Sequence, residues 1–152
     1  MKIQIVHTEP GQQPVAATLA KEIYRSLPRT EARIASVSQA RADDDSLILA
    51  VFSVRNGAFA PIVPFYRELR DQKVAFVAVL TGPVDPARVR KTVWGIKKQF
   101  CGNQVLAGYL CPADDDVAWG LSADELGKVL AFARRTYEEH CQVLPAPMAV
   151  NY

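Results

Sequence analysis

A polar turn near the start of the chain carries the residues best suited to binding chemistry. It offers one hydroxyl and several backbone or side-chain amide donors, on Thr8, Gly11, Gln12 and Gln13. Pro14 follows as the first-turn proline of an expected helix, whose opening N–H groups have no partners within the helix. Because such donors attract anions, the pattern predicts that residues 7–14 form one wall of an anion-binding site. A tight turn that binds nothing is the alternative.

Two later turns could complete this site. Residues 53–60 contain Phe59, an aromatic ring for stacking, and Arg55, a cation for an anionic group. Thr81 and Gly82 begin a third turn, whose backbone N–H groups could approach a ligand. In the alternative interpretation Phe59 packs in the core, Arg55 is a solvated loop charge and Gly82 only supplies a tight bend.

The cysteines and His7 give weaker signals. The chain has three cysteines without C-x-x-C spacing, at Cys101, Cys111 and Cys141. This usage argues against a disulfide framework or a zinc site and favours a reduced cytoplasm. Cys111 could be a redox-active thiol, but a small buried hydrophobe is the favoured interpretation. His7 is likewise interpreted as a structural histidine. Two runs of three aspartates lack a converging partner, so we expect no metal site.

Length and composition limit the function classes. The chain has 152 residues, 49% of them hydrophobic and 22% charged, with a net charge of +2. These values predict a single domain over residues 1–141 and an extended tail over residues 142–152. No apolar run approaches the roughly 20 residues that span a bilayer, and we expect no signal segment. The net charge is too small to indicate a nucleic-acid partner.

Hydrophobic periodicity predicts the elements that position the three turns. Apolar runs of strand length start at Ile3 and cover residues 32–37, 46–52, 73–80 and 104–110, and helical patterns cover 14–27, 61–69, 86–100 and 122–140. Strands that alternate with helices indicate a doubly wound parallel sheet. The second and third strands lack an intervening helix, unless a short one occupies residues 38–42. Because three helices start with proline directly after a strand, their preceding turns should share one edge of the sheet.

The predicted third helix has a basic outer surface. Its cationic residues are Arg88, Arg90, Lys91, Lys97 and Lys98. A solvated helix face and a docking surface for an acidic partner both fit this pattern. Trp94 and Trp119 could be core residues or surface anchors.

The first turn resembles a known phosphate loop. Residues 8–13, Thr-Glu-Pro-Gly-Gln-Gln, align with the S/T-x-T-G-x-T motif of the flavodoxin family, which the sequence resembles over nearly its whole length. The greatest similarity is to a bacterial flavodoxin-like subgroup that includes proteins of bilirubin-reduction operons. Residues 73–82, 85–86 and 108–111 carry it. The resemblance implies a flavodoxin-like α/β fold, with a five-stranded parallel sheet of order 2-1-3-4-5 and helices on both faces.

The resemblance also implies FMN as the cofactor and electron transfer as the function. The phosphate would bind Thr8, Gly11, Gln12 and Gln13, and the flavin ring would lie among Arg55, Asn56, Phe59, Thr81 and Gly82. The protein would be a cytoplasmic carrier without a catalytic residue of its own, and its partner would be a reductase or another oxidoreductase.

The sequence departs from the family pattern at two positions of the loop. Pro10 and Gln13 stand where family members carry threonine, so two hydroxyl donors are missing. Each hydrogen bond to a charged acceptor contributes about 1.5–3 kcal/mol, so their loss weakens FMN binding. The alternative function is therefore a degenerate flavodoxin-fold module that binds or regulates a partner and has lost FMN.

Overall fold

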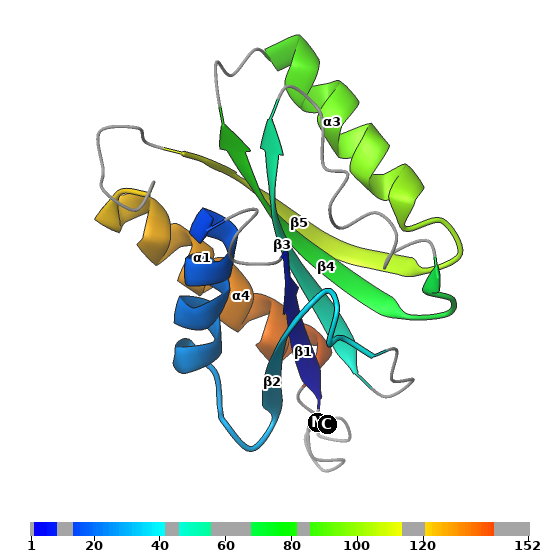
Figure 1. Cartoon of the computed structure of the whole chain (residues 1–152), viewed down its shortest axis with the longest axis vertical. Coiled ribbons are helices and arrows are strands. Elements are labelled where there is room, and N and C mark those ends of the chain that lie inside the picture. Colours follow the sequence, from blue (N-terminus) through cyan, green and yellow to red (C-terminus); the bar gives the residue numbers. More distant parts are fainter. Residues whose placement is uncertain are drawn as a thin grey trace, which may run out of the picture.

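Five parallel strands form one sheet with the order β2-β1-β3-β4-β5 in the computed structural model (Figure 1). The structure describes residues 2–8, 14–41, 46–55, 68–81, 86–113 and 121–141. The strands are β1 Ile3–His7, β2 Ala32–Ser36, β3 Leu47–Arg55, β4 Lys73–Thr81 and β5 Gln104–Pro112. The helices are α1 Pro14–Ser26, α3 Pro86–Gln99 and α4 Ala123–His140. The predicted fold class, strand order and edge position of the second strand are confirmed.

The sheet divides the core into two layers. One layer lies under α1 and α4, where Leu19 and Tyr137 pack onto alternate residues of the central strands such as Leu49 and Val77. The other layer lies under α3, where Ile96 packs with the intervening strand residues such as Phe76. Figure 1 shows α1 and α4 on one face and α3 on the other. The long apolar runs of β3 and β4 therefore form strands because both of their faces are covered.

Local signals explain where the helices begin. Pro14 and Pro86 are the first residues of α1 and α3, as predicted from the preference of proline for the first helical turn. Ser122 is the N-cap of α4, and its hydroxyl accepts a hydrogen bond from the backbone N–H of Glu125 over 3.2 Å. The helix predicted to begin at Pro61 lies outside the described residues, apart from its end near the buried Leu69.

The described part of the connection that follows β2 contains a turn. The sequence leaves open a short helix over residues 38–42 of this connection. The backbone N–H groups of Gln39 and Ala40 both donate to the carbonyl of Ser36. The buried Gln4 of β1 holds the next part of this segment, because its side-chain amide donates to the carbonyl of Arg41 over 2.7 Å. Its amide oxygen accepts from the guanidinium of Arg33 and the backbone N–H of Arg41.

This segment helps to close the core on the α3 face. Val37 and Ala40 pack against the layer that contains Val6 of β1. A short segment fastened by a buried amide thus covers a part of the sheet where a doubly wound fold usually places a helix.

The strand β3 is longer than predicted. The expectation placed Ser53 and Arg55 in a turn, but residues 53–55 continue the strand and pair with Val79, Leu80 and Thr81 of β4. The buried Val54 between them packs into the core on the α3 face, which favours continuation of the strand. Thr81 is likewise the last residue of β4 and does not belong to the following turn.

Candidate functional site

The carboxyl edge of the sheet has a step between β1 and β3. His7, the last residue of β1, pairs with Ser36 at the end of β2 and with Val51 of β3. Beyond Val51, β3 continues for four more residues to Arg55. At the usual spacing of strand residues, β3 therefore extends about 13 Å past the end of β1. We call this the carboxyl step. The strand order reverses at the same place, which is where open α/β sheets bind ligands.

Thr8 and His7 form the base of the carboxyl step. Both side chains are buried, Thr8 completely. The imidazole Nδ1 of His7 lies 2.6 Å from the carbonyl oxygen of Thr8, and the carbonyl of His7 accepts from the backbone N–H of Val37 over 2.8 Å. The prediction that His7 is a structural histidine is therefore confirmed, since its ring and its backbone hold the end of β1 in place.

Thr81 lies beside the end of β3, the strand that extends further at the carboxyl step. Its hydroxyl donates to the carbonyl of Val54 over 3.3 Å, and its backbone pairs with that of Arg55. Thr81 therefore ties together the ends of the neighbouring strands β3 and β4. The backbone carbonyl of Leu80 accepts from Ala113, which extends this tie to the segment after β5.

Three of the nine predicted ligand-binding residues can be placed. Thr8 directly follows β1, and Arg55 and Thr81 are the last residues of β3 and β4, so the parallel sheet brings them to one edge. The other six, Gly11, Gln12, Gln13, Asn56, Phe59 and Gly82, lie outside the described residues. The first residue of α1, Pro14, places the start of this helix at the same edge, because α1 follows β1.

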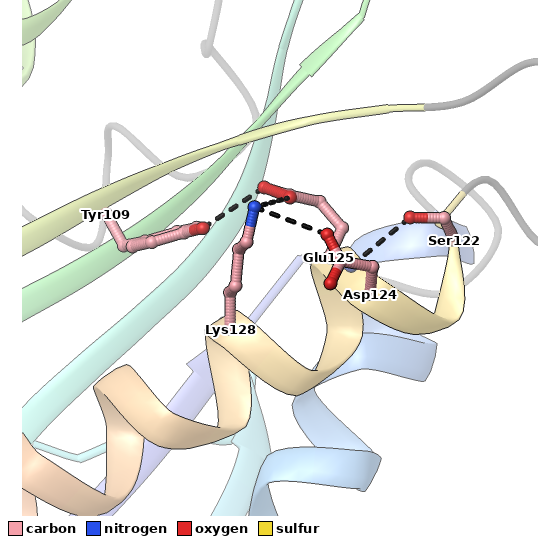
Figure 2. Close-up of polar contacts among 5 residues, drawn as sticks. All are labelled: Tyr109, Ser122, Asp124, Glu125 and Lys128. Carbon is pink, nitrogen blue, oxygen red and sulfur yellow. Dashed lines mark hydrogen bonds and ion pairs between the residues drawn. The ribbon is translucent and has the colours of Figure 1, made fainter.

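A polar cluster fastens α4 to the edge strand β5 (Figure 2). The hydroxyl of Tyr109 donates to the carboxylate of Glu125 over 3.1 Å, and the ammonium of Lys128 lies 3.8 Å from the same carboxylate. Lys128 also lies 3.3 Å from the carboxylate of Asp124. Desolvation, followed by the hydrogen bond to Glu125, raises the pKa of Tyr109 to about 12. The sequence does not predict this cluster. The helix predicted over residues 122–140 places Glu125 in its first turn, which is the one feature of the sequence that points to it.

The cysteines contribute no reactive thiol at this edge. Cys111 is fully buried in the core, and desolvation, helped by the charge of Glu125, raises its pKa to about 12. Because thiolates are the reactive form, the interpretation of Cys111 as a buried hydrophobe is confirmed. Cys141 is also buried, whereas Cys101 is exposed just after α3. Within the described part of the chain, no group of acidic, histidine and cysteine side chains could hold a metal ion.

Comparisons with solved structures identify the fold. A flavodoxin from Streptococcus pneumoniae TIGR4 is 10% identical, with a TM-score of 0.58 over 91% of this chain and 99% of that one. A flavodoxin from the domain Archaea is also 10% identical, with a TM-score of 0.54 over 93% of this chain and 100% of that one. The fold is flavodoxin-like.

A third structure with this flavodoxin-like fold is a flavoprotein in complex with FMN from Lactobacillus acidophilus NCFM. It is 14% identical, with a TM-score of 0.50 over 72% of this chain and 92% of that one. No protein-family model and no curated protein matches the sequence.

The flavodoxin-like strand order has its switch point between β1 and β3. The carboxyl step of this chain lies at that switch point. Among the described helices, none is long and apolar enough to cross a membrane.

Proposed function

We propose that the protein binds FMN at the carboxyl step and carries electrons to and from a partner protein. The observation that carries the proposal is the position of the step, at the β1/β3 switch point and beside the start of α1. Flavodoxin-like sheets of this strand order bind FMN at the β1/β3 switch point. A flavoprotein of similar fold is known in complex with FMN.

The described residues fit this cofactor at two points. The start of α1 lies where a phosphate would be stabilised by N–H donors and by the helix dipole. The bond from Thr81 to the carbonyl of Val54 holds the ends of β3 and β4 together beside the place of the ring. We assign the phosphate to Thr8 and the loop residues 11–13. The ring we assign to Arg55, Asn56, Phe59, Thr81 and Gly82.

The flavin would supply the electron transfer, and the protein would bind it, orient it and exclude water from it. The proposed function therefore requires no acid, base or nucleophile among the residues of the carboxyl step. We further propose a cytoplasmic location, which the three free cysteines favour. The affiliation with the subgroup of bilirubin-reduction operons belongs to the same proposal and rests on residues 73–82, 85–86 and 108–111.

A binding or regulatory module without FMN is the second candidate. Two observations favour it: the Thr8 side chain is completely buried, and the hydroxyl of Thr81 is bonded to a backbone carbonyl. Both hydroxyls then serve the fold. The absence of threonine at Pro10 and Gln13 points in the same direction.

Titration with FMN and with riboflavin separates the two candidates. Quenching of flavin fluorescence gives both affinities, and a phosphate site makes FMN bind more tightly than riboflavin. The Thr8→Val variant removes a hydroxyl and keeps the shape, so it should weaken FMN about tenfold to a hundredfold and leave riboflavin unchanged. Thr18→Val, at an exposed position of α1, is the matched control.

The outcomes of this titration are distinct. A Gly11→Val variant with an unchanged FMN affinity would remove the phosphate assignment. Binding of neither flavin by the wild-type protein would favour the module. Once FMN binding is established, the photoreduced holoprotein should reduce cytochrome c, and failure to do so would reject the carrier function alone.

A further inference from the structure

The outward surface of α3 is basic and has no acidic residue. Its exposed side chains recur at spacings that place them on one helix face: Arg90, Lys91, Trp94, Lys97 and Lys98. We call these five residues the basic face. The whole sequence of α3, Pro86–Gln99, contains no aspartate or glutamate. None of the ion pairs within the described part of the chain involves a cation of the basic face.

Trp94 lies in the middle of the basic face. It is 63% exposed and is the one large hydrophobic residue exposed within the described ranges. The ammonium of Lys98 lies 3.9 Å from the centroid of its ring, a cation–π contact that holds the indole against the helix surface. An indole surrounded by cations is typical of a binding hot spot, because tryptophan and arginine dominate such sites.

A hollow adjoins the basic face. It has a volume of about 210 Å³ and lies between α3 and β5. Its lining includes Phe76, Val93, Lys97, Val105, Gly108 and Leu110. Lys97 belongs to both the hollow and the basic face, so the two features form one continuous surface. Because β5 is the last strand of the sheet, no further strand of the described sheet closes this side.

We propose that the basic face and the adjoining hollow together bind an acidic segment of another protein. Carboxylates of the segment pair with the cations of α3, Trp94 packs against its backbone or an apolar side chain, and a second apolar side chain enters the hollow beside Lys97. The proposal depends on α3, β5 and Phe76 of β4, and it does not require FMN.

The chemistry of the surface favours a protein over a membrane or a nucleic acid. A helix that lies on a membrane presents a broad apolar face, whereas α3 exposes a single large apolar side chain. Nucleic-acid-binding domains usually have an isoelectric point above about 9, and this chain has a value of about 8.5 with a net charge of +2. A central tryptophan, surrounding charges and a hollow for one side chain match the anatomy of a protein interface.

Selection from a library of short random peptides displayed on phage tests this proposal. The immobilised wild-type protein should enrich peptides that carry a net negative charge and at least one large apolar residue. Their affinity for the wild type and each variant is then measured by the fluorescence anisotropy of a dye attached to the peptide, and the emission of Trp94 is followed separately in a Trp119→Phe background. Binding should shift the emission of Trp94 to the blue as its ring leaves water, and added salt should weaken it.

Three variants locate the binding surface. Lys97→Glu/Lys98→Glu and, separately, Trp94→Ala should each weaken the selected peptides by about tenfold or more. Lys21→Glu/Arg29→Glu makes the same charge change at exposed positions in α1 and the following turn and is the matched control, with at most a twofold effect. Circular dichroism verifies that each variant is folded.

Several outcomes would overturn the proposal. These are enrichment of no peptide, enrichment of neutral or basic peptides, and equal weakening by the control variant. Anionic phospholipid vesicles and a single-stranded oligonucleotide are tested in parallel. Tighter binding of either one through the basic face would replace the protein partner by a membrane or a nucleic acid.

Discussion

The helices α3 and α4 cover opposite faces of the sheet and differ in how their charged side chains are paired. On α4, Lys128 pairs with Asp124 and Glu125, and Arg134 pairs with Glu138 over 2.9 Å. Five cations and no acid occur on α3, together with an exposed tryptophan. Since both helices bury an apolar stripe, the difference lies entirely in their outward surfaces. The charged side chains of α4 pair with one another within the helix. Those of α3 have one sign and form no such pairs within the helix, which is the basis of the binding proposal.

The contacts with β5 show the same contrast. On the α4 side, Tyr109 bonds to Glu125 and its ring packs against Phe132 with centroids 5.6 Å apart. On the α3 side, Gly108 has no side chain and a hollow remains. Four substitutions test whether the two sides differ as described.

Gly108→Ala should cause the largest change. A methyl group at this position would lie well inside contact distance of three carbons of the Phe76 ring, which is itself packed in the core. We expect a loss of about 3 kcal/mol in the free energy of unfolding, measured by urea denaturation, because overpacking displaces a buried ring. Adding Phe76→Leu should restore part of the loss.

The matched control lies on α4. A methyl group at Gly127 meets nothing within 4 Å, so Gly127→Ala should stabilise the protein by about 0.5–1 kcal/mol through helix propensity. Equal stability of Gly108→Ala and the wild type would mean that Phe76 moves aside freely, which contradicts the packing described for β5.

Gln4→Ala should cost about 2 kcal/mol of unfolding free energy, since it leaves the buried carbonyl of Arg41 without its side-chain donor. Amide hydrogen exchange should also become faster at Arg41, whose N–H donates to Gln4. Gln39→Ala, at an exposed position of the same turn, should change stability by less than about 0.5 kcal/mol. If both substitutions have the same small effect, the buried amide does not hold the segment that covers the α3 face.

Ser122→Ala should lower the unfolding free energy by about 1 kcal/mol, because the N-cap acceptor of Glu125 N–H is lost. Ser122→Asp supplies another acceptor and should retain the stability of the wild type. Thermal unfolding followed by circular dichroism measures both. A loss in the aspartate variant equal to that in the alanine variant would argue against capping as the cause.

Tyr109→Phe should have the smallest effect at neutral pH, about 1 kcal/mol or less, and a characteristic effect in alkali. The pKa of Tyr109 is raised from 10.0 to about 12 in the folded protein. Its contribution is therefore complete below pH 10 and is lost as the pH rises towards 12, because the unfolded chain releases this proton first.

The wild-type protein should thus lose stability between pH 10 and 12 more steeply than Tyr109→Phe. Cys111 and Cys141 also have raised pKa values, of about 12 and about 11, and titrate in both proteins. The charge of Cys111 is one of the smaller causes of the raised pKa of Tyr109. Ultraviolet absorbance of the phenolate provides an independent titration. Identical pH dependence of the two proteins would contradict the partly buried hydrogen bond between Tyr109 and Glu125.

Much of the fold could be predicted from the sequence, because its signals are local. Residues 74–80 form an unbroken apolar run that matches β4 closely, and Pro14 and Pro86 mark helix starts. The end of β3 was misplaced because residues 53–55 are kept in the strand by pairing with β4, an interaction between distant segments. The anchoring of Arg41 by Gln4 has the same long-range origin.

The candidate site was predictable in part. Parallel strands imply that Thr8, Arg55 and Thr81 meet at one edge, and the structure places them there. The height of the carboxyl step could not be predicted, since it depends on the register of β1 against β3. The basic residues of α3 were visible in the sequence, but the exposure of Trp94 and the hollow beside it required coordinates.

The unequal burial of the three thiols has a practical consequence. Cys101, the exposed one, follows α3 at the end remote from the carboxyl step, while burial and raised pKa values protect Cys111 and Cys141. A maleimide dye or spin label added under native conditions should therefore attach at one position without mutagenesis. Such a reporter would sense events along α3 while leaving the opposite rim of the sheet untouched.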